Sequence, residues 1–121
     1  MATDLFERHE GGERVVMVQL TIDDGEAPED PHEFDELVRS AGGEPVALIT
    51  GHRRSPSAKF YAGTGKVEEI LAVKEAEEAE LVVFNHPLTP SQERNLEREL
   101  KCRVIARTGL ILDIFAQRAR I

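Results

Sequence analysis

Four short runs of apolar, largely β-branched residues recur along the chain. The first, residues 14–20 (RVVMVQL), is apolar on both faces, which is typical of a buried strand in a parallel sheet. Residues 45–50 (PVALIT) predict a second buried strand. Residues 81–84 (LVVF) and 103–106 (RVIA) predict two more, so the pattern favours four strands in all.

Helical spacing fills the intervals between these runs. Asp30 and Pro31 predict a helix start, the next apolar side chains fall on one helical face, and Gly42 and Gly43 end it. Residues 66–80 predict a second helix. Thr89, Pro90 and Gln92 have the spacing of a capping box that opens a third. The expected inward residues are Phe34, Leu37, Val38 and Ala41, then Val67, Ile70 and Leu71, and finally Leu96 and Leu100.

This alternation of strands and helices predicts an α/β fold. Right-handed crossovers would give a four-stranded parallel sheet with helices on both faces, and doubly wound folds favour the strand order 2-1-3-4. The loops at the carboxyl ends of the strands would then meet at one edge. We expect the acidic turn after the first strand, the loop 51–65 and the turn 85–87 to gather there.

The last apolar segment, residues 107–119 (RTGLILDIFAQRA), predicts a helix that is apolar around much of its girth. A helix of this kind must be covered. We expect it to fold back onto the sheet, to fray or to pair with a second copy, and its apolar face makes this chain prone to dimerise. The predicted organisation is a loose leader at 1–13, an α/β domain at 14–107 and the start of a linker helix at 108–121.

Composition narrows the class of protein. A chain of 121 residues with 40% hydrophobic and 31% charged residues fits one globular domain. No apolar run is long enough to span a bilayer, so we expect a cytoplasmic protein. One Tyr and no Trp argue against single-strand binding by base stacking. The lone Cys102 lies on a predicted strand and is expected to act as a small buried hydrophobe.

The net charge of −8 conceals a split between two parts of the chain. Residues 1–50 carry thirteen acidic and three basic residues, a charge of −10, whereas residues 51–121 carry ten acidic and twelve basic residues, a charge of +2. A polarised domain can present one basic face to RNA. The alternative is that both kinds of charge are solvated surface.

The loop 51–65 (GHRRSPSAKFYAGTG) is the first place to look for chemistry, because loops of this length are usually functional or mobile. Gly63, Gly65 and Lys66 open a helix, as a phosphate site would require. However, Val67 follows Lys66 and Phe60 stands five residues before Gly65, so the P-loop pattern is not met. The dinucleotide pattern is not met either, because no glycine lies three residues after Gly65. A plain turn and helix cap is the alternative.

The spacing of the histidine and glutamate residues does not indicate a catalytic or metal site. The four histidines are widely separated, and His52 and His86 are expected to be solvated loop residues. The glutamate pairs read as helix surface. We therefore predict no catalytic residue, no metal site and no cofactor in this chain.

Three blocks together resemble one family. They are YAGTGKVEEI at 61–70, LTPSQERNLE at 88–97 and RTGLILDIFAQRA at 107–119. In this order and spacing they are similar to the amino-terminal domain of the HflX family of ribosome-associated GTPases. The resemblance covers about residues 14–121 and departs from the family at Ala106, where an Asp usually precedes Arg107.

The resemblance implies that a helical coiled coil and a P-loop GTPase domain follow this module in the parent protein. GTP and Mg²⁺ would bind in that GTPase domain, which is absent from this chain. The parent would act on the large ribosomal subunit, splitting ribosomes under stress. The partners implied are the large subunit with its RNA and the protein's own GTPase domain.

Candidate residues for RNA or phosphate contact share positive charge or a position at the helix start: Arg53, Arg54, Lys59, Gly63, Gly65, Lys66, Arg94 and Arg98. Candidate interdomain residues are Asn95, Arg107, Asp113, Phe115 and Arg118. Two other functions stay open: a nucleotide-binding accessory domain, and a structural domain that restrains the GTPase domain.

Overall fold

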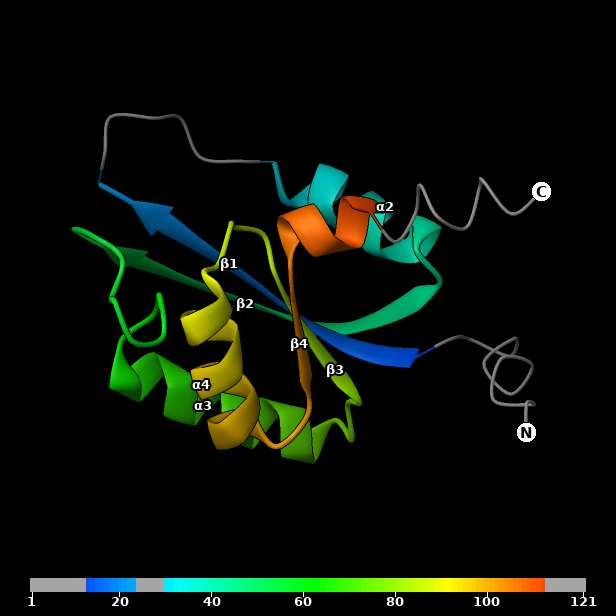
Figure 1. Ribbon diagram of the computed structural model, residues 1–121. Helices are drawn as coiled ribbons and strands as arrows, with labels where there is room; N and C mark the ends of the chain where they lie inside the picture. The colour runs from blue at the N-terminus through cyan, green and yellow to red at the C-terminus, as the bar shows by residue number, and fades with distance from the viewer. Residues whose placement is uncertain (1–12, 24–29, 113–121) are drawn as a thin grey trace.

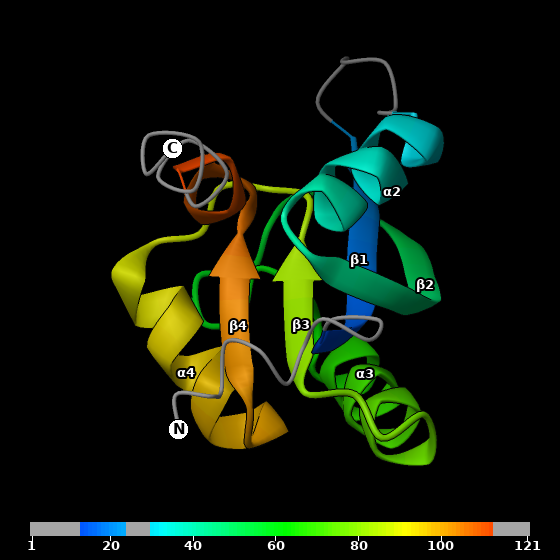
Figure 2. The same cartoon turned by 90° about the vertical axis from the view of Figure 1, so that its right-hand side faces the viewer.

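A four-stranded parallel sheet forms the centre of the computed structural model, which describes residues 13–23 and 30–112. The strands are β1 (Glu13–Ile22), β2 (Gly43–Arg53), β3 (Leu81–Phe84) and β4 (Arg103–Ala106). Their order in the sheet is β2-β1-β3-β4 (Figures 1 and 2). Both the α/β class and the predicted strand order are therefore confirmed.

Helices cover both faces of the sheet. Helix α2 (Pro31–Ser40) and the helical segment 107–112 lie on one face, and α3 (Thr64–Ala76) and α4 (Pro90–Leu100) lie on the other (Figure 1). The predicted starts of α2 and α4 are confirmed, whereas α3 begins at Thr64, two residues before the predicted start at residue 66. Asp30 Oδ1 accepts a hydrogen bond of 3.0 Å from the His32 amide, and the capping box joins Thr89 and Gln92 in both directions.

Two apolar cores flank the sheet, and β1 contributes side chains to both of them. Val16 and Val18 belong to the core under α3 and α4, whereas Val15 and Met17 belong to the core under α2. Successive side chains of a strand point to opposite faces, so a run buried throughout needs a helix layer on each side. The segment 107–112 contributes Leu110 to the second core.

Strand β2 corrects the prediction of a second fully buried strand. It lies at the edge of the sheet, and Leu48 remains 40% exposed while Ile49 is buried. The register shifts between Val15 and Val16, which pair with Pro45 and Ala47, so Val46 is an extra residue in β2. An edge position also tolerates Pro45, because proline has no amide to donate to a neighbour.

The predicted fifteen-residue loop is shorter in the structure. Strand β2 continues to Arg53, because its final residues pair with β1 as far as Ile22. Helix α3 begins at Thr64, and a β-bridge joins Ser57 to Tyr61 between these two elements. Helix α3 ends at Ala76, whereas the sequence predicted its end at residue 80.

The final helix is described only as far as residue 112. Leu110 is buried against the sheet, whereas Ile111 and Leu112 are 44% and 62% exposed. The described part of this helix thus folds back onto the sheet through a single buried side chain, that of Leu110. Asp113, Phe115 and Arg118 lie outside the described residues. Within 13–23 and 30–112, no helix is long and apolar enough to cross a membrane.

Candidate functional site

The carboxyl edge of the sheet gathers segments that are far apart in the sequence. The Asn85 amide donates to the Val18 carbonyl, and the Asp23 amide donates to the Arg53 carbonyl at 2.8 Å. Tyr61 of the loop before α3 stacks on His86 after β3, with ring centroids 4.8 Å apart. The expected meeting of this loop with the turn 85–87 is confirmed. Residues 24–29 of the acidic turn lie outside the described part.

His86 is buried, which corrects the expectation of a solvated loop histidine. Only 8% of its surface is exposed, and its Nε2 accepts a hydrogen bond of 2.8 Å from the Leu20 amide. Its carbonyl accepts from the Arg107 amide, where the segment 107–112 begins. His86 therefore ties β1, β4 and the loop before α3 together. His52 is exposed, as expected.

The start of α3 forms one side of a hollow of about 240 Å³. Four predicted residues line it together with Leu20 and His52: Arg53, Gly63, Gly65 and Lys66. A Cβ on Gly63 would lie 2.5 Å from Arg53 Nη1, so glycine permits the guanidinium to lie against the helix start. Gly63 caps α3 without a side-chain hydrogen bond.

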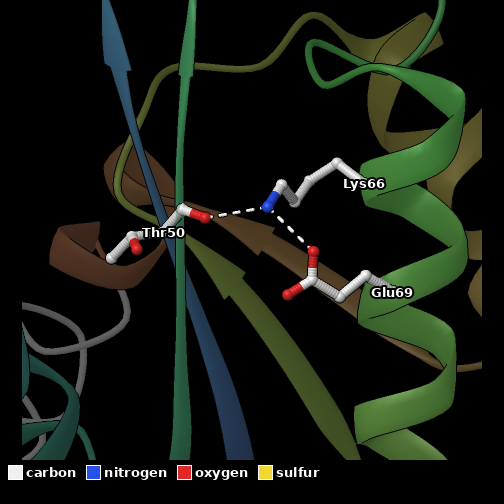
Figure 3. A network of polar contacts seen from close by, with 3 residues as sticks. All are labelled: Thr50, Lys66 and Glu69. Atoms are coloured by element: carbon white, nitrogen blue, oxygen red, sulfur yellow. Dashed lines mark hydrogen bonds and ion pairs between the residues drawn. The ribbon is translucent and has the colours of Figure 1, made fainter.

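Lys66 is committed to internal partners. Its Nζ donates to the Thr50 carbonyl at 2.9 Å and to Glu69 Oε1 at 2.8 Å (Figure 3). A Cβ on Gly51 would lie 2.9 Å from Lys66 Cε, so the lysine stem packs directly on the glycine backbone. The Lys66 ammonium is already paired with the Glu69 carboxylate, which weakens its attraction for a phosphate in the hollow.

A second group of predicted residues meets on the other side of the loop, against α4. Asn95 Nδ2 donates to the Lys59 carbonyl at 3.1 Å, and Gln92 Nε2 donates to the Ser57 carbonyl at 2.8 Å. Ser57 and Tyr61 exchange two backbone hydrogen bonds of 2.9 Å. These contacts fix the loop on α4. Lys59 is exposed, with its Nζ 5.2 Å from the centroid of the Phe60 ring.

Arg94 and Arg98 are exposed on α4, one turn apart, and Lys101 follows at the helix end. Sequence reasoning missed Lys101 as a member of this group. The signal was its position directly after the last residue of the helix that carries Arg94 and Arg98. Lys101 adopts a left-handed backbone with φ of 58°, as helix-terminating residues often do.

The remaining candidates are placed separately. Arg54 is exposed between β2 and the loop, and Arg107 is partly buried at the start of the last helical segment.

Burial raises the pKa of the Cys102 thiol, which is packed partly against the core under α4. Within 13–23 and 30–112, no three His, Cys, Asp or Glu side chains converge on a position that would suit a metal ion.

The arrangement is that of a doubly wound α/β domain with exposed basic side chains at Arg94 and Arg98 of α4, at its C-cap Lys101 and at Lys59 of the neighbouring loop. The family model described as GTP-binding GTPase N-terminal matches residues 29–116. The chain belongs to this family, as the amino-terminal domain of an HflX-type GTP-binding protein.

Known relatives agree with this placement. GTPase HflX of Escherichia coli (strain K12) is 51% identical over 116 residues, which cover 96% of this chain and 27% of that protein. GTPase HflX of Alkalihalophilus pseudofirmus is 43% identical over 110 residues, or 89% of this chain and 26% of that protein. The chain therefore spans about a quarter of these relatives.

A solved structure shows the same architecture. The crystal structure of a GTP-binding protein from the archaeon Sulfolobus solfataricus, in complex with GDP, superposes with a TM-score of 0.61 at 26% identity. The match covers 85% of this chain and 30% of that protein.

Proposed function

We propose that this domain helps an HflX-type GTPase to bind the large ribosomal subunit by contacting phosphates of ribosomal RNA. The parent would split ribosomes under stress, with GTP and Mg²⁺ held by its GTPase domain and not by this chain. The observation that carries the RNA contact is the group of exposed basic side chains on α4, at its C-cap and on the neighbouring loop: Lys59, Arg94, Arg98 and Lys101. In a chain of net charge −8, such a surface gives local attraction for phosphate without coating RNA generally.

A co-sedimentation experiment tests this function. The chain is mixed with purified large or small ribosomal subunits at rising salt, and the bound fraction is measured. We expect binding to the large subunit, with a logarithmic affinity that falls by roughly 0.7 to 0.9 per phosphate contact for each tenfold rise in salt. Equal binding to both subunits, or none at all, would overturn the proposal.

A nucleotide site at the hollow is the second candidate function. It is favoured by the uncapped start of α3 beside Arg53, since helix amides and a guanidinium both suit a phosphate. The Lys66–Glu69 contact opposes it. Titration calorimetry with ATP, ADP and GTP tests this candidate. A dissociation constant of about 1 mM corresponds to a binding free energy near −4 kcal/mol, so the absence of heat at about millimolar nucleotide would reject the site.

A third candidate, restraint of the parent's GTPase domain, rests on the family membership and on the exposed Ile111 and Leu112 next to the exit of the domain. GTP turnover of the parent protein, measured with and without residues 1–121, would reveal such restraint as a faster rate for the shortened protein. Unchanged turnover would remove this candidate.

A further inference from the structure

The solvent-facing side of α4 and its C-cap carry a row of basic side chains. Arg94 and Arg98 stand one turn apart on the helix, and Lys101 follows at the C-cap, where the backbone is left-handed with φ of 58°. All three are exposed. The opposite side of the helix is buried in the core through Gln92, Leu96 and Leu100. Because α4 is anchored in this way, the direction of the basic row is fixed by the fold.

Ion pairing separates this row from four other basic residues of the described chain, Arg14, Arg39, Lys66 and Lys74. Within 13–23 and 30–112, no salt bridge involves Arg94, Arg98 or Lys101, although Glu93, Glu97 and Glu99 lie on the same helix. The carboxylate of Glu97 is turned toward the sheet, where its Oε2 accepts from the Val104 amide at 3.2 Å. By contrast, four other basic residues in these ranges do form salt bridges: Lys66–Glu69, Arg14–Glu77, Arg39–Asp35 and Lys74–Glu75.

Lys59 extends the row at its side. Its carbonyl is held by Asn95, which lies next to Arg94 and three residues before Arg98 on α4. The loop that carries Lys59 is also fixed to α4 by Gln92. A lysine on a loop fixed in this way loses less backbone freedom on binding than one on a free loop.

We propose that Lys59, Arg94, Arg98 and Lys101, here called the α4 basic ridge, form the surface of this domain that contacts the RNA phosphate backbone. This inference rests on the proposed function and selects one of its two basic regions. The hollow at α3 is the weaker candidate, because Lys66 would have to leave Glu69 to neutralise a phosphate. The ridge makes no base-specific contact by stacking, since the neighbouring aromatic side chains Phe60 and Tyr61 are buried.

Three variants of the chain with the same change in net charge test the ridge. The first is R94Q/R98Q/K101Q, on the ridge. The second is R53Q/R54Q/K66Q, at the hollow. The third is the matched control R14Q/R39Q/K74Q, which neutralises basic residues that are already ion-paired and lie elsewhere. Circular dichroism confirms the fold of each, and affinity for large subunits is measured across a salt series.

We expect the ridge variant to lose about tenfold or more in affinity, with a salt slope shallower by roughly two to three. The control should stay within about twofold of the unaltered chain, and the hollow variant should lose clearly less than the ridge variant. A larger loss for the hollow variant would overturn the ridge but keep the proposed function. Binding that no variant alters would reject the RNA contact altogether and indicate docking on ribosomal protein.

Discussion

At the carboxyl end of β1, the Leu20 amide is satisfied by a side chain, because the neighbouring strand β3 already ends at Phe84. His86 supplies the acceptor, and His86→Phe would keep a ring against Tyr61 while removing that acceptor. A buried amide without a partner costs about 1–3 kcal/mol, so we expect a decrease of this size in the free energy of unfolding. Urea denaturation measures it.

The control for His86 is His52→Phe, which changes an exposed histidine on β2 in the same way. It should shift the free energy of unfolding by no more than about 0.5 kcal/mol. Equal effects of the two substitutions would mean that the loss comes from the new phenyl ring and not from the missing acceptor.

Cys102 provides a prediction about pH. Burial, the largest cause, raises the pKa of its thiol, and Glu97 also raises it, while Lys74 and a hydrogen bond with the backbone of Val82 lower it. The folded chain should therefore react with iodoacetamide at about pH 8 several-fold more slowly than the urea-unfolded chain, because the thiolate is the nucleophile.

The same raised pKa has a consequence for stability. The unfolded thiol ionises at a lower pH than the folded one, so the contribution of Cys102 is complete below the unfolded pKa of about 8.5 and is lost as pH rises through the folded value. Lys74→Gln removes a charge that lowers the pKa, and labelling should slow further. Faster labelling of this variant would contradict the assigned cause.

At the scale of elements, Gln92 joins a helix start to a loop. Its Oε1 accepts from the Thr89 amide at 2.9 Å within the capping box, and its Nε2 donates to the Ser57 carbonyl. Gln92→Glu retains the first contact and removes the second, in a side chain that is buried. We expect a loss of about 1–3 kcal/mol in the free energy of unfolding.

Glu93→Gln is the matched control for that substitution. It makes the reverse exchange, carboxylate to amide, at the next position of α4 and leaves the loop contact unaltered. Hydrogen exchange at the amides of Ser57 and Tyr61 should quicken in the Gln92 variant and not in the control. Unchanged exchange at both amides would show that the loop does not depend on α4.

Local patterns predicted the elements of this domain well, because strand and helix periodicity and the caps at Asp30 and Thr89 are properties of short segments. The parallel sheet followed from the crossover rule, and the order of its strands from analogy with doubly wound folds. What could not be predicted depends on contacts between distant segments. The burial of His86 depends on a strand 66 residues away, and the commitment of Lys66 to Thr50 requires the fold to bring β2 beside α3. The hydrogen bond from Asn95 to the Lys59 carbonyl also depends on the fold, because it joins α4 to the loop before α3.

For the whole molecule, the exposed apolar side chains bear on association. The large hydrophobic residues exposed in the described ranges are Leu48 on β2 and Ile111 and Leu112 beside the buried Leu110. The predicted dimer through the last helix would use Ile111 and Leu112 together, whereas Leu48 stands alone and single exposed hydrophobic residues are ordinary. If the helix pairs two copies, I111E/L112E should be monomeric at concentrations where the unaltered chain is dimeric.

Light scattering at a series of concentrations measures this difference in mass, and L48E serves as the control because it also replaces an exposed leucine by an acid. We expect L48E to keep the dimer. Circular dichroism shows whether each variant remains folded, as it should, since none of the three positions belongs to the buried cores. A monomer at every concentration for the unaltered chain would reject pairing and assign the last helix to fold-back through Leu110. Dissociation of L48E alone would place the contact on the edge strand β2, where an unpaired strand edge is the usual site of association.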